Sequence, residues 1–159
     1  MYIIKWNKED KDLPIEKRKK IRLYISSPGG NTFNGNILSN VILQSKTPII
    51  GIALDLCASA AYYAFLACDE RIAFQETSFL QHEGEISIEN SRSKAKQTAE
   101  FFDSMEDKAK QFILSRTNIT AELYDQVYDN EFWMDAEKAK ELGVIHKIIG
   151  QDCDLDYIL

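Results

Sequence analysis

The chain of 159 residues lacks the features that mark several large protein classes. Its three cysteines, Cys57, Cys68 and Cys153, do not show the spacing of a metal site. No apolar run approaches the length of a membrane span, and residues 1–5 are too short for a signal peptide. The net charge of −6 argues against a nucleic-acid binder. These absences favour a cytoplasmic protein with reduced thiols.

Internal repeats, low-complexity segments and linkers are also lacking, so the pattern predicts one domain with a sizeable core. Residues 1–20 form the least legible segment, residues 21–150 the domain, and residues 151–159 a C-terminal tail. Strand and helix patterns alternate within the domain. This alternation predicts an α/β fold with a mainly parallel sheet and right-handed crossovers.

The first candidate functional segment is a glycine turn between a strand and a helix. Residues 21–25 are rich in β-branched and aromatic side chains and predict a buried strand, while residues 31–46 have apolar side chains at helical spacing. Between them, residues 27–30 are Ser-Pro-Gly-Gly. Glycine reaches backbone angles closed to other residues, so such a turn can leave amide groups free to hold an oxyanion. A simple connecting turn explains the same pattern.

A second unit of the same kind contains Ser59. Residues 48–54 predict another apolar strand, and residues 55–62 lead into a helix through small side chains. Ser59 falls where the strand gives way to the helix. Its hydroxyl is therefore either a helix cap or an exposed group that a substrate can approach.

One of the two histidines, His82, completes the pattern. It follows residues 78–81, after the strand candidate at residues 71–74. A serine needs a base to become a nucleophile, and histidine is the usual base near neutral pH. The sequence thus places a serine and a histidine at the ends of neighbouring predicted strands. His146 is interpreted as structural.

The remaining pattern predicts three helices and a final strand. Residues 90–116 form a long amphipathic helix with apolar side chains at steps of three and four. Residues 120–128 form a shorter helix capped by Thr120, and residues 136–142 one capped by Asp135. Residues 144–149 predict the last strand.

These segments, taken in order, resemble the proteolytic subunit of the Clp protease and related prophage-encoded serine peptidases. The resemblance covers residues 20–149. It is carried by the Ser-Pro-Gly-Gly turn, the segment 51–64 around Ala-Ser-Ala-Ala, the strand Phe-Leu-Gln-His at 79–82, and the C-terminal signature at 131–145. It implies a crotonase-like spiral of βαβ units with a long protruding handle helix.

The resemblance implies a Ser-His-acid triad that hydrolyses peptide bonds, with no metal or organic cofactor. Ser59 is the nucleophile, and His82 is the general base and then the general acid. The acid falls on Glu131, where most members have aspartate, and Asp129 is the rival. If both acids lay on a strand, alternation would point them to the same face.

The resemblance also implies the groups around the triad. The oxyanion hole is formed by the amides of Gly29 and Ala60. Substrate peptides lie as an added strand beside residues 29–33 and 83–88, so Gly30, Asn31 and Glu83 are the substrate-binding candidates.

The implied partners are other copies of the chain, in a heptameric ring or stacked rings. Phe101, Phe102 and Met105 of the handle helix are expected to bury against another subunit. Family members normally have a further strand, helix and axial loop before the Ser-Pro-Gly-Gly strand, and this region, which docks an unfoldase ATPase, is nearly absent here. The chain is thus a truncated form or fragment, or it works without an ATPase partner.

Two functions of other classes stay open. One is an inactive, structural ring subunit, which the short N-terminal segment and Glu131 favour. The other is an acyl-CoA enzyme of the crotonase type, which shares the fold and uses similar oxyanion amides.

Overall fold

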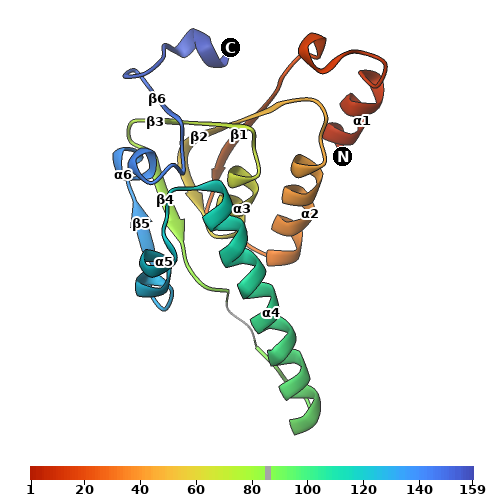
Figure 1. The fold of residues 1–159 in the computed structure, drawn as a ribbon, viewed down its shortest axis with the longest axis vertical. Helices are drawn as coiled ribbons and strands as arrows, with labels where there is room; N and C mark the ends of the chain where they lie inside the picture. The colour runs from red at the N-terminus through yellow and green to blue at the C-terminus, as the bar shows by residue number, and fades with distance from the viewer. Residues whose placement is uncertain (85–86) are drawn as a thin grey trace.

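The computed structural model describes residues 1–84 and 87–159, and these form an α/β fold around a curled sheet (Figure 1). The strands are β1 (Ile21–Ser27), β2 (Ile49–Ala58), β3 (Glu70–Phe74), β4 (Ser78–Gln81), β5 (Phe132–Met134) and β6 (Lys147–Ile149). The helices are α1 (Tyr2–Glu9), α2 (Thr32–Leu43), α3 (Ala60–Leu66), α4 (Arg92–Arg116), α5 (Ala121–Val127) and α6 (Ala136–Glu141), with short 3-10 helices η1 (Ile15–Lys17) and η2 (Leu155–Ile158).

Strand β2 organises the sheet because it is long enough to pair with three neighbours. Strand β1 follows one edge of β2 in parallel, from the pair Ile21 and Ile49 to the pair Ser27 and Cys57. The other edge pairs first with β3 and then, three residues further on, with β4. All these pairings are parallel, as the alternating pattern predicts, and only β4 and β5 are antiparallel. The carboxyl ends of β1, β2 and β4 therefore meet at one edge of the sheet.

The core lies between the sheet and α3, whose large side chains are fully covered. Tyr62, Phe65 and Leu66 are each 0 % exposed. They pack with side chains of β2, β4, α6 and the end of α4. Burial of this kind stabilises a fold by about 1.5–3 kcal/mol for each large apolar side chain. Helix α3, which follows Ser59 directly, is thus fixed against the sheet.

Helix α4 protrudes from the body as a single long rod (Figure 1). Its one fully buried side chain, Ile113, lies near the end that joins the body. Phe101, further out, is exposed. No helix among residues 1–84 and 87–159 is long and apolar enough to cross a membrane.

Several predicted boundaries differ from the structure. The glycine turn is followed by a helix that ends at Leu43 rather than near residue 46, and its apolar residues Phe33 and Ile37 are exposed. The final strand begins at Lys147, because Val144 and Ile145 form a tight turn whose amides bond to the carbonyl of Ala139. The N-terminal segment contains a helix, α1, that buries Ile3 against α2 and its neighbours.

The predicted caps and the structural role of His146 agree with the structure. Asp135 accepts a bond from the amide of Lys138, and Thr120 accepts one from Leu123. The His146 ring accepts a bond from the Arg71 amide through Nδ1 at 3.0 Å. Burial lowers the pKa of His146, so the ring stays neutral, as its accepting role requires.

Candidate active site

Ser59 occupies an unusual backbone conformation at the junction of β2 and α3. Its φ of 53° and ψ of −126° make it the one residue other than glycine with positive φ among the described residues. Its side chain makes no capping hydrogen bond to α3. Its amide donates instead to the carbonyl of Leu80 at 2.9 Å, which fixes the junction to the end of β4. Strained backbone of this kind concentrates at functional sites.

The glycine turn after β1 packs directly against this junction. Gly29 has a φ of 95°, and a Cβ atom there would lie 2.6 Å from the carbonyl oxygen of Ala58 and 2.9 Å from the nitrogen of Ala60. Only glycine permits so close an approach of two backbone segments. The register of β1 on β2, with Ser27 opposite Cys57, is what brings the turn to this position.

Two backbone amides of this junction lack a partner among the described residues. Ala60 is the first residue of α3, and Gly30 has a φ of 137° with open space around it. The amide of Gly29, in contrast, donates to the hydroxyl of Ser27 at 3.1 Å. The turn therefore offers Gly30 and Ala60 as unbonded donors beside Ser59, while the expected donor Gly29 is already engaged.

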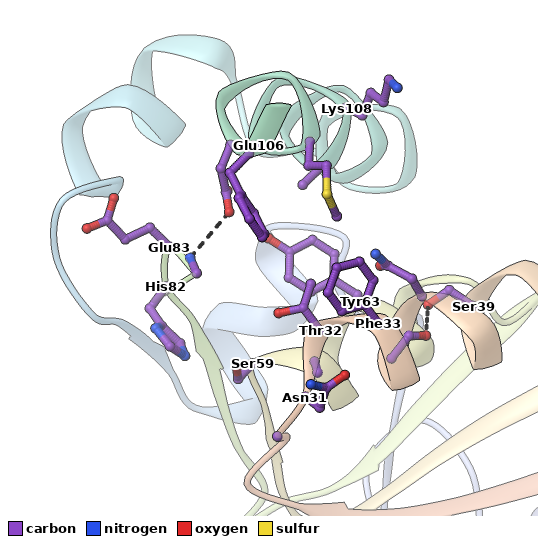
Figure 2. Close-up of a pocket in the computed structure, with 18 of the residues that line it drawn as sticks. Asn31, Thr32, Phe33, Ser39, Ser59, Tyr63, His82, Glu83, Glu106 and Lys108 are labelled. Atoms are coloured by element: carbon purple, nitrogen blue, oxygen red, sulfur yellow. Dashed lines mark hydrogen bonds between the residues drawn. The ribbon is translucent and has the colours of Figure 1, made fainter. Parts of the chain in front are cut away.

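These segments open into a cavity of about 990 Å³ between α4 on one side and α2 and α3 on the other (Figure 2). The cavity brings together six residues predicted from the sequence to form the site: Gly30, Asn31, Ser59, Ala60, His82 and Glu83. Aromatic side chains of all three helices line its walls. The arrangement can hold an extended peptide beside a hydroxyl and an imidazole.

His82 lies one residue beyond β4 and is half-buried. Because β4 pairs with the last residues of β2, the ring comes to the same end of the cavity as Ser59 (Figure 2). Among the described residues no hydrogen bond joins the Ser59 hydroxyl to the His82 ring. The two groups thus share one cavity without being bonded to each other.

The structure does not bring the predicted acids into the cavity. Strand β5 begins at Phe132, so Asp129 and Glu131 both precede it and the alternation argument does not apply to them. Both residues are exposed, and the Glu131 carboxylate accepts a bond from the Trp133 indole at 2.9 Å. Neither lines the cavity.

Cys57 lies near Ser59 in the sequence but is not a competing nucleophile. It is 0 % exposed, and burial raises its pKa far above the ordinary range of a thiol. The side chain is therefore a protonated, inaccessible thiol, whereas Ser59 opens to the cavity.

Several residues of the cavity were not predicted from the sequence, and one of them is Glu106 of α4. Its carboxylate accepts a bond from the amide of Gly84 at 3.3 Å, two residues beyond His82 (Figure 2). The helical spacing could have revealed it, because Glu106 follows Phe102 by four residues on the same face. A carboxylate on an otherwise apolar helix face indicates a functional residue, but a pattern that counts only apolar residues does not include it.

Comparison with known proteins shows the family of the chain. A family model described as Clp protease matches residues 13–152. The chain belongs to the Clp protease family. Curated Clp relatives include the ATP-dependent Clp protease proteolytic subunit 2 of Treponema pallidum, 29 % identical over 139 residues that cover 86 % of this chain and 70 % of the relative. Subunit 3 of Rhizobium johnstonii is 25 % identical, covering 85 % and 71 %.

The fold of this Clp family member also matches a solved structure. A point mutant of ClpP1 from Listeria monocytogenes superposes with a TM-score of 0.78, covering 99 % of this chain and 88 % of the other at 20 % sequence identity. The match confirms the predicted Clp-like α/β fold. Membership of the family supports serine peptidase activity.

Proposed function

We propose that this chain is a serine endopeptidase in which Ser59 is the nucleophile and His82 the general base. The single observation that carries the proposal is the junction of Ser59: a strained serine, uncapped, open to a large cavity and flanked by unbonded amides. The same cavity contains His82. A Clp family model that spans this whole region supports the assignment.

In the proposed reaction the Ser59 oxygen attacks the carbonyl carbon of a substrate peptide bond. His82 takes the hydroxyl proton and then gives it to the departing amine, leaving an acyl-enzyme. His82 next deprotonates a water that attacks the acyl carbon. The bond between this carbon and the Ser59 oxygen then breaks, His82 returns the proton to that oxygen, and the carboxylic product is released. Bond formation requires a Ser59–His82 contact near 3 Å, so substrate binding draws the two side chains together.

Backbone amides stabilise the negative oxygen of each tetrahedral intermediate. The sequence assigned this role to Gly29 and Ala60. Ala60 is suited to it, and at the glycine turn the amide of Gly30 is the one that has no partner in the described part of the chain. Gly29 contributes by allowing the turn to touch the Ser59 junction.

The acid of the triad is proposed to be Glu131, with Asp129 as the alternative. Either must move toward His82, because both are exposed outside the cavity. Glu131 would exchange its bond to Trp133 for one to the imidazole. An acid in that position fixes the tautomer of the ring and stabilises the imidazolium.

Substrates are proposed to be peptides or unfolded segments that bind as an added strand between the glycine turn and the segment after His82. Gly30, Asn31 and Glu83 line the cavity on these two sides. The predicted far side, residues 83–88, includes Glu85 and Ile86, which lie outside the described residues. We further propose a cytoplasmic homo-oligomeric ring, in which the exposed Phe101 is covered by a second copy.

The test is the variant Ser59→Ala assayed with fluorogenic peptides. Hydrolysis should fall to background while the far-UV circular dichroism spectrum is retained. A fluorophosphonate should add one adduct to the wild type and none to Ser59→Ala. Ser104→Ala, which changes an exposed serine of α4, is the matched control and should keep full activity. Unchanged turnover in Ser59→Ala would defeat the proposal.

The alternative of an inactive structural subunit has one observation in its favour, the missing Ser59–His82 hydrogen bond among the described residues. The same experiment separates the two functions. A folded wild-type chain that hydrolyses no peptide and takes up no fluorophosphonate, alone or with a second subunit type, is a structural subunit.

A further inference from the structure

The wall that α4 contributes to the cavity is mainly apolar, and Glu106 is its one acidic side chain among the described residues. Its lining side chains follow helical spacing: Thr98, Phe102, Met105, Glu106, Ala109 and Phe112. The opposite wall contains Phe33 of α2 and Tyr63 of α3. Glu106 is thus a carboxylate between aromatic surfaces, and Figure 2 shows it directed toward the segment after His82.

The carboxylate of Glu106 has no cationic partner among the described residues. The ion pairs that α4 forms among the described residues are between other side chains, Lys96 with Glu100 and Lys110 with Asp125. Within residues 1–84 and 87–159, its one hydrogen bond is from the amide of Gly84 at 3.3 Å. Burial raises the pKa of Glu106, because water solvates the charge of a partly buried carboxylate incompletely.

The cavity as a whole is negatively charged. Glu83 and Glu89 also line it, on the side of the segment after His82. Lys108 is the one lysine or arginine among the described lining residues, and in Figure 2 its side chain points away from the cavity. Among the described lining residues, no cationic side chain is therefore placed to neutralise the carboxylates that face the groove.

We infer that Glu106 makes this groove selective for polypeptides with a lysine or arginine side chain at the position that faces α4. A lysine or arginine has an apolar stem that packs between aromatic surfaces and a charged head that pairs with a carboxylate. The walls formed by Phe33, Tyr63 and Phe102 fit the stem, and Glu106 lies where the head would end. This inference rests on the proposed peptidase function and specifies its substrate class.

The test compares variants that separate the charge of Glu106 from its hydrogen bond. Glu106→Gln removes the charge but keeps an oxygen that can accept from Gly84, whereas Glu106→Ala removes both. Glu100→Gln is the matched control, since Glu100 lies on the same helix, is exposed and does not line the cavity. Each protein is assayed with quenched-fluorescence hexapeptides in which lysine or arginine replaces norleucine or citrulline at one position at a time.

The expected result is a preference of about tenfold in kcat/KM for the basic residue at one position, in line with a hydrogen bond to a charged group. Glu106→Gln should abolish the preference while still cleaving the norleucine peptide, and Glu100→Gln should retain it. Equal rates for basic and neutral peptides at every position, or a preference that survives Glu106→Gln, overturns the inference.

A binding measurement distinguishes failure of this inference from failure of the peptidase proposal. Fluorescein-labelled lysine and norleucine hexapeptides are titrated into Ser59→Ala and into the double variant with Glu106→Gln. Tighter binding of the lysine peptide, lost in the double variant, supports the inference even if the wild type cleaves nothing. Absence of binding, or equal binding of both peptides to Ser59→Ala, overturns it.

Discussion

The two ends of α3 are built in opposite ways. At the first end, Ser59 has a strained backbone, makes no capping bond, and opens to a cavity. At the last end, two arginines bind the carbonyl groups that a helix terminus leaves without partners. Arg71 donates to Leu66 and Cys68, and Arg116 donates to Leu66, Ala67 and Cys68.

The difference shows where stability and function are located in this domain. The closed end, residues 66–68 with Arg71 and Arg116, satisfies its polar groups. It also links α3 to the end of α4, since Arg71 donates to the carbonyl of Arg116 at 2.8 Å. The open end, formed by Ser59, Ala60 and the glycine turn, leaves the amides of Gly30 and Ala60 without partners among the described residues and retains backbone strain. This lowers the stability of the fold, but it prepares the two amides for an incoming oxyanion. A rigid closed end allows the open end to remain strained without rearranging.

The largest effect is expected at the closed end, from Arg71→Ala. The Arg71 side chain makes five hydrogen bonds to carbonyl groups, and the residue is 3 % exposed. Its removal leaves buried acceptors unsatisfied, so we expect a loss of about 3 kcal/mol or more. That corresponds to a fall in Tm of roughly 10 °C for a domain of this size.

Thermal unfolding followed by circular dichroism measures this loss. Lys20→Ala is the comparison, because Lys20 makes only an exposed, long contact to Glu70 at 3.9 Å and should change Tm little. A fall in Tm no larger than that of Lys20→Ala would show that the closed end does not carry the stability assigned to it.

The next effect is expected at the open end, from Gly29→Ala. The added Cβ would lie 2.6 Å from the Ala58 oxygen and 2.7 Å from the Ser59 Cβ, so the turn must shift away from the nucleophile. Since loss of one oxyanion donor costs about 100- to 1000-fold in turnover, we expect a loss of kcat of that order.

Gly150→Ala separates this local effect from general backbone strain. Gly150 has a similar φ of 90° but lies in open space, outside the cavity. Both alanine variants should lose stability through the positive φ, and Gly29→Ala should lose more because of its backbone clash, while peptide turnover falls only in Gly29→Ala. Equal turnover in the two variants contradicts the role of the Gly29 contact.

A smaller effect follows from the strain of Ser59 itself. Ser59→Gly relieves a backbone conformation that costs of order 1 kcal/mol or more in a residue with a side chain, whereas Ser59→Ala retains it. We therefore expect Ser59→Gly to melt about 2–4 °C above Ser59→Ala, although both lack the nucleophile. Differential scanning calorimetry compares the two, and an identical Tm would mean that the serine is not strained.

Parts of this contrast could be predicted from the sequence. The glycine turn, Ser59 and His82 each follow a strand, and parallel strands bring such positions to one edge of the sheet. The location of Glu131 was beyond such reasoning, because it depends on the loop before β5. The closed end was also not predicted. Arg71 donates only to backbone carbonyl groups, and every residue has one, so no acidic partner in the sequence indicates these bonds.

Glu106 was missed for a related reason. The spacing of apolar residues predicts which face of α4 packs against the body. It does not predict a role for a charged residue on that face, even when the residue lines a cavity as Glu106 does. The exposed Phe33 and Ile37 of α2 show the converse, because helical spacing does not reveal which apolar residues remain uncovered in a single chain.

The smallest effect concerns the charge of Glu106 at the open end. Burial raises its pKa in the folded chain, so the neutral form suits the fold better than the ionised form. The stability that this neutral form contributes is present below the unfolded pKa of about 4.3 and is lost as the pH rises through the higher folded value. Glu106→Gln should therefore raise Tm slightly at pH 7.

The advantage should disappear near pH 4, where the wild-type carboxyl is largely protonated and resembles the amide. Tm is measured at both pH values for the wild type, for Glu106→Gln and for the exposed control Glu100→Gln. A gain at neutral pH together with loss of selectivity for basic peptides would show that this carboxylate is retained for recognition at the expense of stability. A lower Tm of Glu106→Gln at pH 7 would instead mean that the Glu106 carboxylate stabilises the fold, as the arginine bonds at the closed end of α3 do.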